Sequence, residues 1–171
     1  GVGNRRITAD ALGPRTMQHI LVTMGAGAAP PVQGLRPVAA VAPGVAAATG
    51  LSLQQLAAAL VGQLRPAAVV CVDSLCSAEG QRLGRTVQFS DSGLYPAQAD
   101  HTRHLTRDTL GVPVVAAGIP TLMQAQEGAD LVVTPRALDS VIAQGAALLA
   151  CAVNRALQPR LTVQQLCWLT G

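Results

Sequence analysis

Two uninterrupted hydrophobic stretches predict buried strands. Residues 67–73 form the first stretch, which ends in the carboxylate of Asp73, and residues 112–117 form the second. Such runs are typical of parallel strands, because helices cover both faces of the sheet. Further short strands are expected at 37–41, 86–90 and 130–134. The pattern therefore predicts a sheet with Asp73 at the carboxyl end of a central strand.

Helical periodicity and capping residues predict the remaining elements. Residues 52–64 have apolar side chains at helical intervals after Ser52, and Gln55 completes a capping box. A long helix is expected from Thr134-Pro135 toward Leu157. Shorter helices are expected at 12–22 and after the capping box at 162–165. Residues 24–33 and 95–109 are expected to be loops, the second with a helical turn, and residues 118–121 a turn.

Alternating strands and helices predict a single domain, residues 1–171, with a three-layer α/β/α architecture and a mainly parallel sheet. Ligands of such sheets bind beyond the carboxyl ends of the strands. No apolar run reaches the ~20 residues that span a membrane, and the first residues have no features of a secretory signal, so no membrane partner is expected.

Composition narrows the classes of function. All 12 basic residues are arginines, scattered along the chain, and there is one each of Trp, Tyr and Phe, which argues against nucleic-acid binding. The four cysteines form no C-x-x-C pair, so we expect buried free thiols and a cytoplasmic protein.

Two aspartates are the candidate chemical groups. Asp73 closes a buried strand, where a carboxylate must find partners, and this favours a functional role. Asp10 precedes a predicted helix, so a helix N-cap is its structural alternative. Paired carboxylates divide the roles of general base and general acid, because proximity and desolvation separate their titrations.

Other motifs give weaker hypotheses. Asp91-Ser92-Gly93 has the signature of pepsin-like proteases, but those proteins are all-β, so Asp91 is interpreted as a turn residue and a possible third carboxylate. His101 and His104 lack an obvious third metal ligand. Gly1-x-Gly3 lacks the rest of a dinucleotide fingerprint, so it is interpreted as a tight turn. No cofactor and no metal are expected.

Seven segments in register resemble the germination protease family of spore-forming bacteria. They include Gly1-Val2-Gly3-Asn4 with 8–14, Gly34-Leu35-Arg36-Pro37-Val38 with 42–45, Val72-Asp73, Asp91-Ser92-Gly93-Leu94, 109–114, Gly118-Ile119-Pro120-Thr121 and Val133-Thr134-Pro135. The family's propeptide and first strand have no counterpart here. Arg5 replaces a usual aromatic residue, and the stretch after Gly93 is shortened.

The resemblance implies a fold similar to hydrogenase-maturation endopeptidases, with Asp10 and Asp73 as the catalytic pair. It also implies a homo-oligomer, made as a zymogen in the cytoplasm of the forespore or spore core, that degrades small acid-soluble spore proteins during germination. Asn4, Arg36 and Arg103 are candidate substrate-binding residues, and a surface salt bridge is the alternative for either arginine. Two alternatives stay open: a non-catalytic sporulation protein or inactive paralogue, and a nickel-dependent maturation endopeptidase.

Overall fold

The computed structural model describes residues 1–25, 33–95, 104–124 and 132–170. Its sheet contains β1 (Val69–Ser77), β2 (Gln88–Ser90), β3 (Val114–Gln124) and β4 (Val132–Val133). The α-helices are α1 (Leu12–Thr16), α2 (Ala46–Thr49), α3 (Leu53–Leu64), α4 (Arg107–Leu110), α5 (Leu138–Leu157) and α6 (Val163–Thr170). Three short 3-10 helices are η1 (Thr8–Asp10), η2 (Met17–His19) and η3 (Gly80–Arg82).

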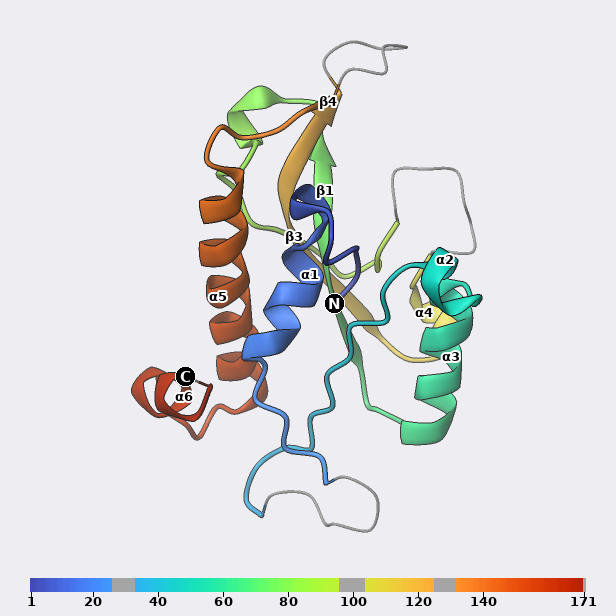
Figure 1. Ribbon diagram of the computed structural model, residues 1–171. Helices are drawn as coiled ribbons and strands as arrows, with labels where there is room; N and C mark the ends of the chain where they lie inside the picture. Colours follow the sequence, from blue (N-terminus) through green and yellow to red (C-terminus); the bar gives the residue numbers. More distant parts are fainter. Residues whose placement is uncertain (26–32, 96–103, 125–131, 171) are drawn as a thin grey trace.

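A mixed sheet forms the centre of the molecule. Its longest pairing is the parallel one between β1 and β3, in which Asp73 lies opposite Gly118. The short strands β2 and β4 pair antiparallel with β3. Helices α1 and α5 lie on one side of the sheet, and α3 and α4 lie on the other (Figure 1). The predicted α/β class, with helices on both faces of the sheet, is confirmed.

Alternate residues of the central strands enter two separate cores. Val72 of β1 faces α1 and α5, where it packs in a cluster with Leu12 and Ile142. Its neighbour Cys71 faces the opposite way, into a cluster with Leu94. This alternation is the two-residue period of a strand, and apolar burial on both faces stabilises the sheet.

Strand β1 differs from its prediction in where it ends. It continues through Ser77, so Asp73 is the fifth of its nine residues, and the prediction that Asp73 marks the carboxyl end is wrong. The hydrophobic run stops at Asp73, but backbone pairing with β3 continues to Met123. Pairing of this length depends on a strand some 45 residues away in the sequence, and the local pattern does not carry that information.

The predicted turn at 118–121 is also wrong, because these residues lie inside β3. A Cβ atom on Gly118 would lie 2.4 Å from the carbonyl oxygen of Asp73, so the glycine allows the two strands to approach closely. The register with β1 shifts between Leu75 and Cys76, opposite Pro120. Gly and Pro therefore mark a close approach and an irregularity within a strand here, rather than its end.

Two other segments differ from prediction. The helix predicted at 12–22 stops at Thr16 and tightens into η2. The side chain of Asn154 then bonds the backbone of His19 and Leu21, which takes the place of further helical bonds. Residues 37–41 form no strand, because the carbonyl of Val38 bonds the N–H groups of a loop, those of Thr23 and Met24.

The predicted helices at 52–64 and after 162 are confirmed as α3 and α6, and Ser52 and Thr162 form the predicted capping-box bonds. The long helix toward Leu157 is α5, but its predicted start at Thr134-Pro135 is wrong, because it begins at Leu138 with no side-chain cap. The short helix α2 was not predicted. By length and composition alone α5 could cross a membrane, but it packs against α1 and supplies Ile142 and Leu149 to the core.

Candidate active site

Asp73 lies in the middle of β1, and its side chain is buried, with 8% exposed. Its Oδ1 accepts a hydrogen bond of 2.8 Å from the backbone N–H of Ser74. The facing position on β3 is Gly118, which has no side chain. A buried carboxylate is costly unless it is hydrogen-bonded, so this contact fixes one of its oxygens.

Asp10 ends η1, two residues before α1 begins. Its Oδ2 accepts a hydrogen bond of 2.7 Å from the backbone N–H of Asn4. The N-cap residue of α1 is Ala11, and no side chain caps this helix. The helix-cap interpretation of Asp10 is therefore wrong: its carboxylate bonds the loop that begins the chain.

Backbone contacts join the segments that carry the two aspartates. The N–H of Val2 donates to the carbonyl of Val72, the residue before Asp73, at 2.8 Å. Two residues later along the same segment, Asn4 bonds Asp10. The first residues of the chain thus lie between η1 and β1, and Asp10 and Asp73 belong to neighbouring parts of one structure.

A second contact fixes η1 on the sheet. The hydroxyl of Thr121, fully buried in β3, donates a hydrogen bond of 2.6 Å to the carbonyl of Ala9. Helix η1 packs against both β1 and β3. Ala9, the residue before Asp10, is therefore held by a side chain 112 residues away in the sequence, next to the half of β3 that follows Gly118.

Gly3 is needed for the close packing of this loop. It has a φ of +122°, and a Cβ atom there would lie 2.0 Å from the backbone oxygen of Asp10 and 3.0 Å from its Oδ1. An L side chain rarely adopts such a conformation. A tight turn was predicted for this segment. In the structure the chain bends at Gly3 and passes close to Asp10.

Two cysteine thiols on β1 have pKa values that are shifted by burial and by the charge of Asp73. Burial raises the pKa of Cys71 to about 11, and the negative charge of Asp73 adds to this effect. Cys76 lies at an exposed position, but partial desolvation and the charge of Asp73 also raise its pKa. Both thiols are therefore protonated at neutral pH, and neither is activated as a nucleophile.

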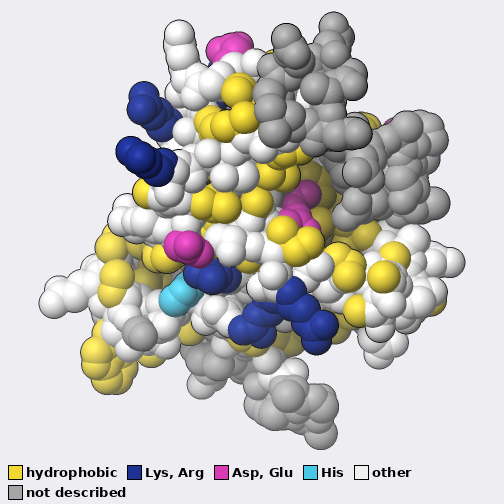
Figure 2. Space-filling model, turned by 45° about the horizontal axis from the view of Figure 1, so that its top comes forward, with side chains coloured by type: hydrophobic (Ala, Val, Ile, Leu, Met, Phe, Trp, Pro, Cys, Tyr) yellow, Lys and Arg dark blue, Asp and Glu magenta, His cyan; other side chains and the backbone are white. Residues whose placement is uncertain are grey.

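Figure 2 shows the face obtained when the top of the molecule comes forward. One acidic group near its centre lies among hydrophobic side chains, and arginine side chains lie below it and at the upper left of the view. Apolar surroundings lower the local dielectric constant and strengthen the interaction of carboxylates with any group placed between them.

Of the other candidate residues, Asp91 lies away from Asp73, and Asn4 lies beside Asp10. Asp91 is exposed and follows β2, near the level of Ala116, whereas Asp73 lies level with Gly118 on the far side of β3. The Oδ1 atom of the Asn4 side chain accepts a bond from the N–H of Arg6.

Two arginines complete the predicted set. Arg36 lines a separate cavity, and Arg103 lies outside the described residues, as does His101. Within the described ranges, no three His, Cys, Asp or Glu side chains gather in a metal-binding arrangement.

Three residues that were not predicted to be site residues shape this site. Thr121 and Gly118 belong to a Gly-Ile-Pro-Thr segment that the pattern alone assigned to a turn. Ser74 gives its N–H to Asp73, and its own hydroxyl is buried with no hydrogen-bond partner among the described residues. The only sequence signal for Thr121 is its place in the Gly-Ile-Pro-Thr segment that resembles the family, and this segment lies inside β3.

The fold and the site define an α/β protein in which Asp73 lies within β1 and Asp10 ends η1, a 3-10 helix that packs against β1 and β3. A family model described as "Germination protease" matches residues 1–129. The chain belongs to the germination protease family.

Individual relatives agree with this assignment. The germination protease of Halalkalibacterium halodurans is 37% identical over 147 residues, which cover 83% of this chain and 38% of that protein. That of Bacillus subtilis is 38% identical over 130 residues, 73% of this chain and 35% of the relative. That of Clostridium perfringens is 29% identical, with 97% and 67% covered. The chain thus spans about a third to two thirds of the length of these relatives.

A solved structure with a related arrangement is the [NiFe] hydrogenase maturation protease HycI from Thermococcus kodakarensis. It covers 92% of this chain, and 88% of its own chain is covered, with 20% sequence identity and a TM-score of 0.48.

Proposed function

We propose that this chain is the catalytic part of an endopeptidase in which Asp10 and Asp73 activate a water molecule. The observation that carries the proposal is the pair of contacts that hold Asp10 beside β1: Asn4 to its carboxylate and Thr121 to the preceding carbonyl. Two carboxylates on adjacent, rigidly held segments suit general acid–base chemistry better than a structural role.

The proposed reaction uses one ionised and one protonated aspartate. The ionised group takes a proton from water as the water oxygen bonds to the peptide carbonyl carbon. The protonated group donates its proton to the leaving nitrogen as the C–N bond breaks, so the pair keeps a single shared proton. Either aspartate can be the general base and the other the general acid, because a shared proton belongs to the pair.

The substrate and setting are part of the same proposal. Family membership supports small acid-soluble spore proteins as substrates, degraded in the spore core at germination by a homo-oligomer made as a zymogen. Asn4, beside Asp10, is the substrate-binding candidate nearest the site, and Arg103 stays a prediction. No metal or cofactor enters the proposed steps.

The test is cleavage of a small acid-soluble spore protein by the purified chain, with and without a chelator. We expect chelator-resistant cutting that falls at least ~100-fold in both Asp10→Asn and Asp73→Asn, the effect of removing a general acid or base. Asp139→Asn, an exposed carboxylate in the first turn of α5, is the matched control and should leave cutting unchanged.

Other results would contradict the proposal. Full activity in either site variant would exclude the aspartate pair. Loss of cutting by chelator, restored by nickel, would favour a metal-dependent maturation-type endopeptidase. A folded, oligomeric protein that cuts no spore protein would favour a non-catalytic role.

A further inference from the structure

A second site lies away from the aspartates. A cavity of about 450 Å³ is lined by residues 34–37 and 158–160. These segments meet at the end of α5 nearest α6, whereas η1 lies toward the other end of that helix (Figure 1). The cavity is therefore separate from the proposed catalytic site.

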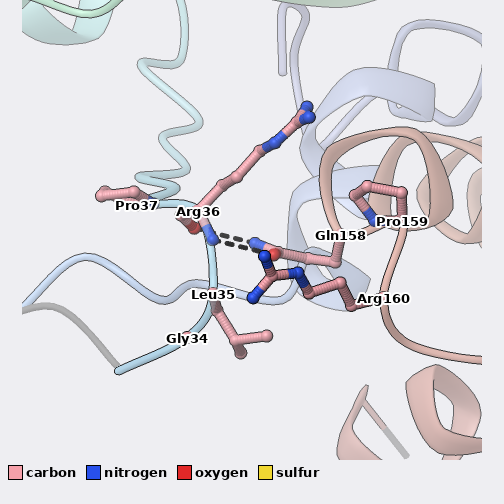
Figure 3. Close-up of a pocket in the computed structure, with 7 residues that line it drawn as sticks. All are labelled: Gly34, Leu35, Arg36, Pro37, Gln158, Pro159 and Arg160. Carbon is pink, nitrogen blue, oxygen red and sulfur yellow. Dashed lines mark hydrogen bonds between the residues drawn. The ribbon is translucent and has the colours of Figure 1, made fainter.

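Buried polar side chains hold the wall of this cavity in place. Gln158 is 2% exposed, and its amide makes both possible bonds to the backbone of Arg36: it accepts from the N–H at 3.0 Å and donates to the carbonyl at 2.8 Å (Figure 3). The buried hydroxyl of Thr23 donates to the same carbonyl and accepts from the N–H of Val38. A loop that uses two buried polar side chains in this way is preorganised.

The cavity carries positive charge, with no acidic partner for it among the residues that the structure describes. Arg36 and Arg160 line it, both are exposed, and none of the seven lining residues is acidic. Across the described parts of the chain, the ion pair within 4.0 Å joins Arg82 and Glu79, so neither cavity arginine is paired with a described carboxylate. We call the two hydrogen bonds between the Gln158 amide and the Arg36 backbone the Gln158 clamp. Figure 3 shows the guanidinium of Arg160 beside this clamp and near Leu35. The side chain of Arg36 extends away from the clamp.

We propose that this cavity binds an oxyanion, either a carboxylate of a peptide or a free phosphate. Arg160 is its main ligand, because its planar guanidinium lies over the fixed loop and can form two parallel bonds with such a group. Arg36 adds a second positive charge. The Gln158 amide uses its oxygen and one N–H on the backbone of Arg36, so its main role is to hold the loop that forms the wall of the site.

Calorimetric titration at low ionic strength tests the proposal, with inorganic phosphate in one arm and a glutamate-rich peptide in the other. We expect saturable binding in at least one arm. Arg160→Gln should weaken it about tenfold, Arg160→Lys less, and Arg36→Gln about threefold, since charge-assisted bonds are the strong ones. Arg107→Gln, an exposed arginine of α4 on the other side of the sheet, is the control and should bind within about twofold of the unaltered chain.

Each outcome decides the proposal. Binding of phosphate alone identifies a small-ion ligand, and binding of the peptide alone identifies a protein ligand. No saturation by either anion up to about 10 mM, or unchanged binding in Arg160→Gln, would overturn the site. The inference is independent of the peptidase proposal, because Asp10 does not line the cavity. The Asp10→Asn variant should therefore bind the anion as the unaltered chain does. Salt should weaken binding in every variant that retains it.

Discussion

The hydroxyl of Thr121 donates a hydrogen bond to the carbonyl of Ala9, and this bond ties the helix that carries Asp10 to the central strand β3. Both groups are buried, so each would lose its partner if the other were removed. The contact joins the two halves of the candidate site, because β3 pairs with the strand that carries Asp73.

Replacing Thr121 with valine should lower both stability and cleavage. Valine keeps the shape but removes the hydroxyl, which leaves the carbonyl of Ala9 unpaired, at a cost of about 1–3 kcal/mol in the free energy of unfolding. Urea denaturation measures the loss. Thr121→Ser keeps the hydroxyl and should recover most of the cleavage rate. Equal activity in the valine and serine variants would show that the bond does not position Asp10.

Gly3→Ala should distort the site more than its size suggests. The new Cβ atom would lie 2.0 Å from the backbone oxygen of Asp10, at a φ of +122°. Strain and overpacking of this kind cost about 1–3 kcal/mol each. We expect a lower unfolding midpoint and a large loss of cleavage.

Gly62→Ala is the matched control for that change. Gly62 lies in α3 with open space around its Cβ position, so alanine there should raise stability by up to ~1 kcal/mol. Thermal unfolding of the two variants should therefore shift in opposite directions. A Gly3→Ala protein as stable and active as the unaltered chain would contradict the role assigned to this turn.

The sequence pattern predicted those helices and strands whose hydrophobic residues recur regularly. The site depends on contacts between residues far apart in the sequence, and such contacts leave no regular pattern. The hydrophobic runs gave β1 and β3 because burial on both faces needs continuous apolar residues. The strand ends could not be predicted, since Ser74 to Ser77 are held by pairing with β3. Asp10 was interpreted as a helix cap because it lies just before a helix. Its actual partner is Asn4, six residues earlier in the sequence, and capping rules do not cover that spacing.

The second site was hidden for the same reason. Gln158 and Arg36 are 122 residues apart in the sequence, so neither the helical pattern of α5 nor the loop around Gly34 indicated that they meet. Arg36 was predicted to bind substrate, with a surface salt bridge as the alternative. The structure shows its backbone clamped by Gln158 and its position in a cavity away from η1.

Removing the Gln158 clamp should destabilise the chain. Gln158→Leu removes a buried amide and leaves the partly buried N–H of Arg36 without its partner, at a cost of about 1 kcal/mol in the free energy of unfolding. Gln144→Leu, at an exposed position of α5, makes the same chemical change and should alter stability by less than ~0.5 kcal/mol. Chemical denaturation compares the pair. Similar stability in both variants would show that the clamp is not a structural contact.

Cys71 should give the protein a stability that decreases at alkaline pH. Its pKa is about 11 in the folded chain, against 9.0 for the free thiol, because burial disfavours the thiolate. The contribution is fully present below pH 9, where the thiol is protonated in both states. It is lost as the pH rises through 9 toward 11, where only the unfolded chain ionises, by about 2–3 kcal/mol in total.

Thiol labelling and denaturation at several pH values test this prediction together. At pH 8 a disulfide reagent should modify the exposed Cys167 quickly, Cys76 more slowly because its pKa is raised, and the buried Cys71 only after unfolding. Cys71→Ala should flatten the decrease in stability between pH 9 and 11, whereas Cys167→Ala should retain it. Rapid labelling of Cys71 in the folded protein would contradict its burial, and with it the packing of β1 on which the position of Asp73 depends.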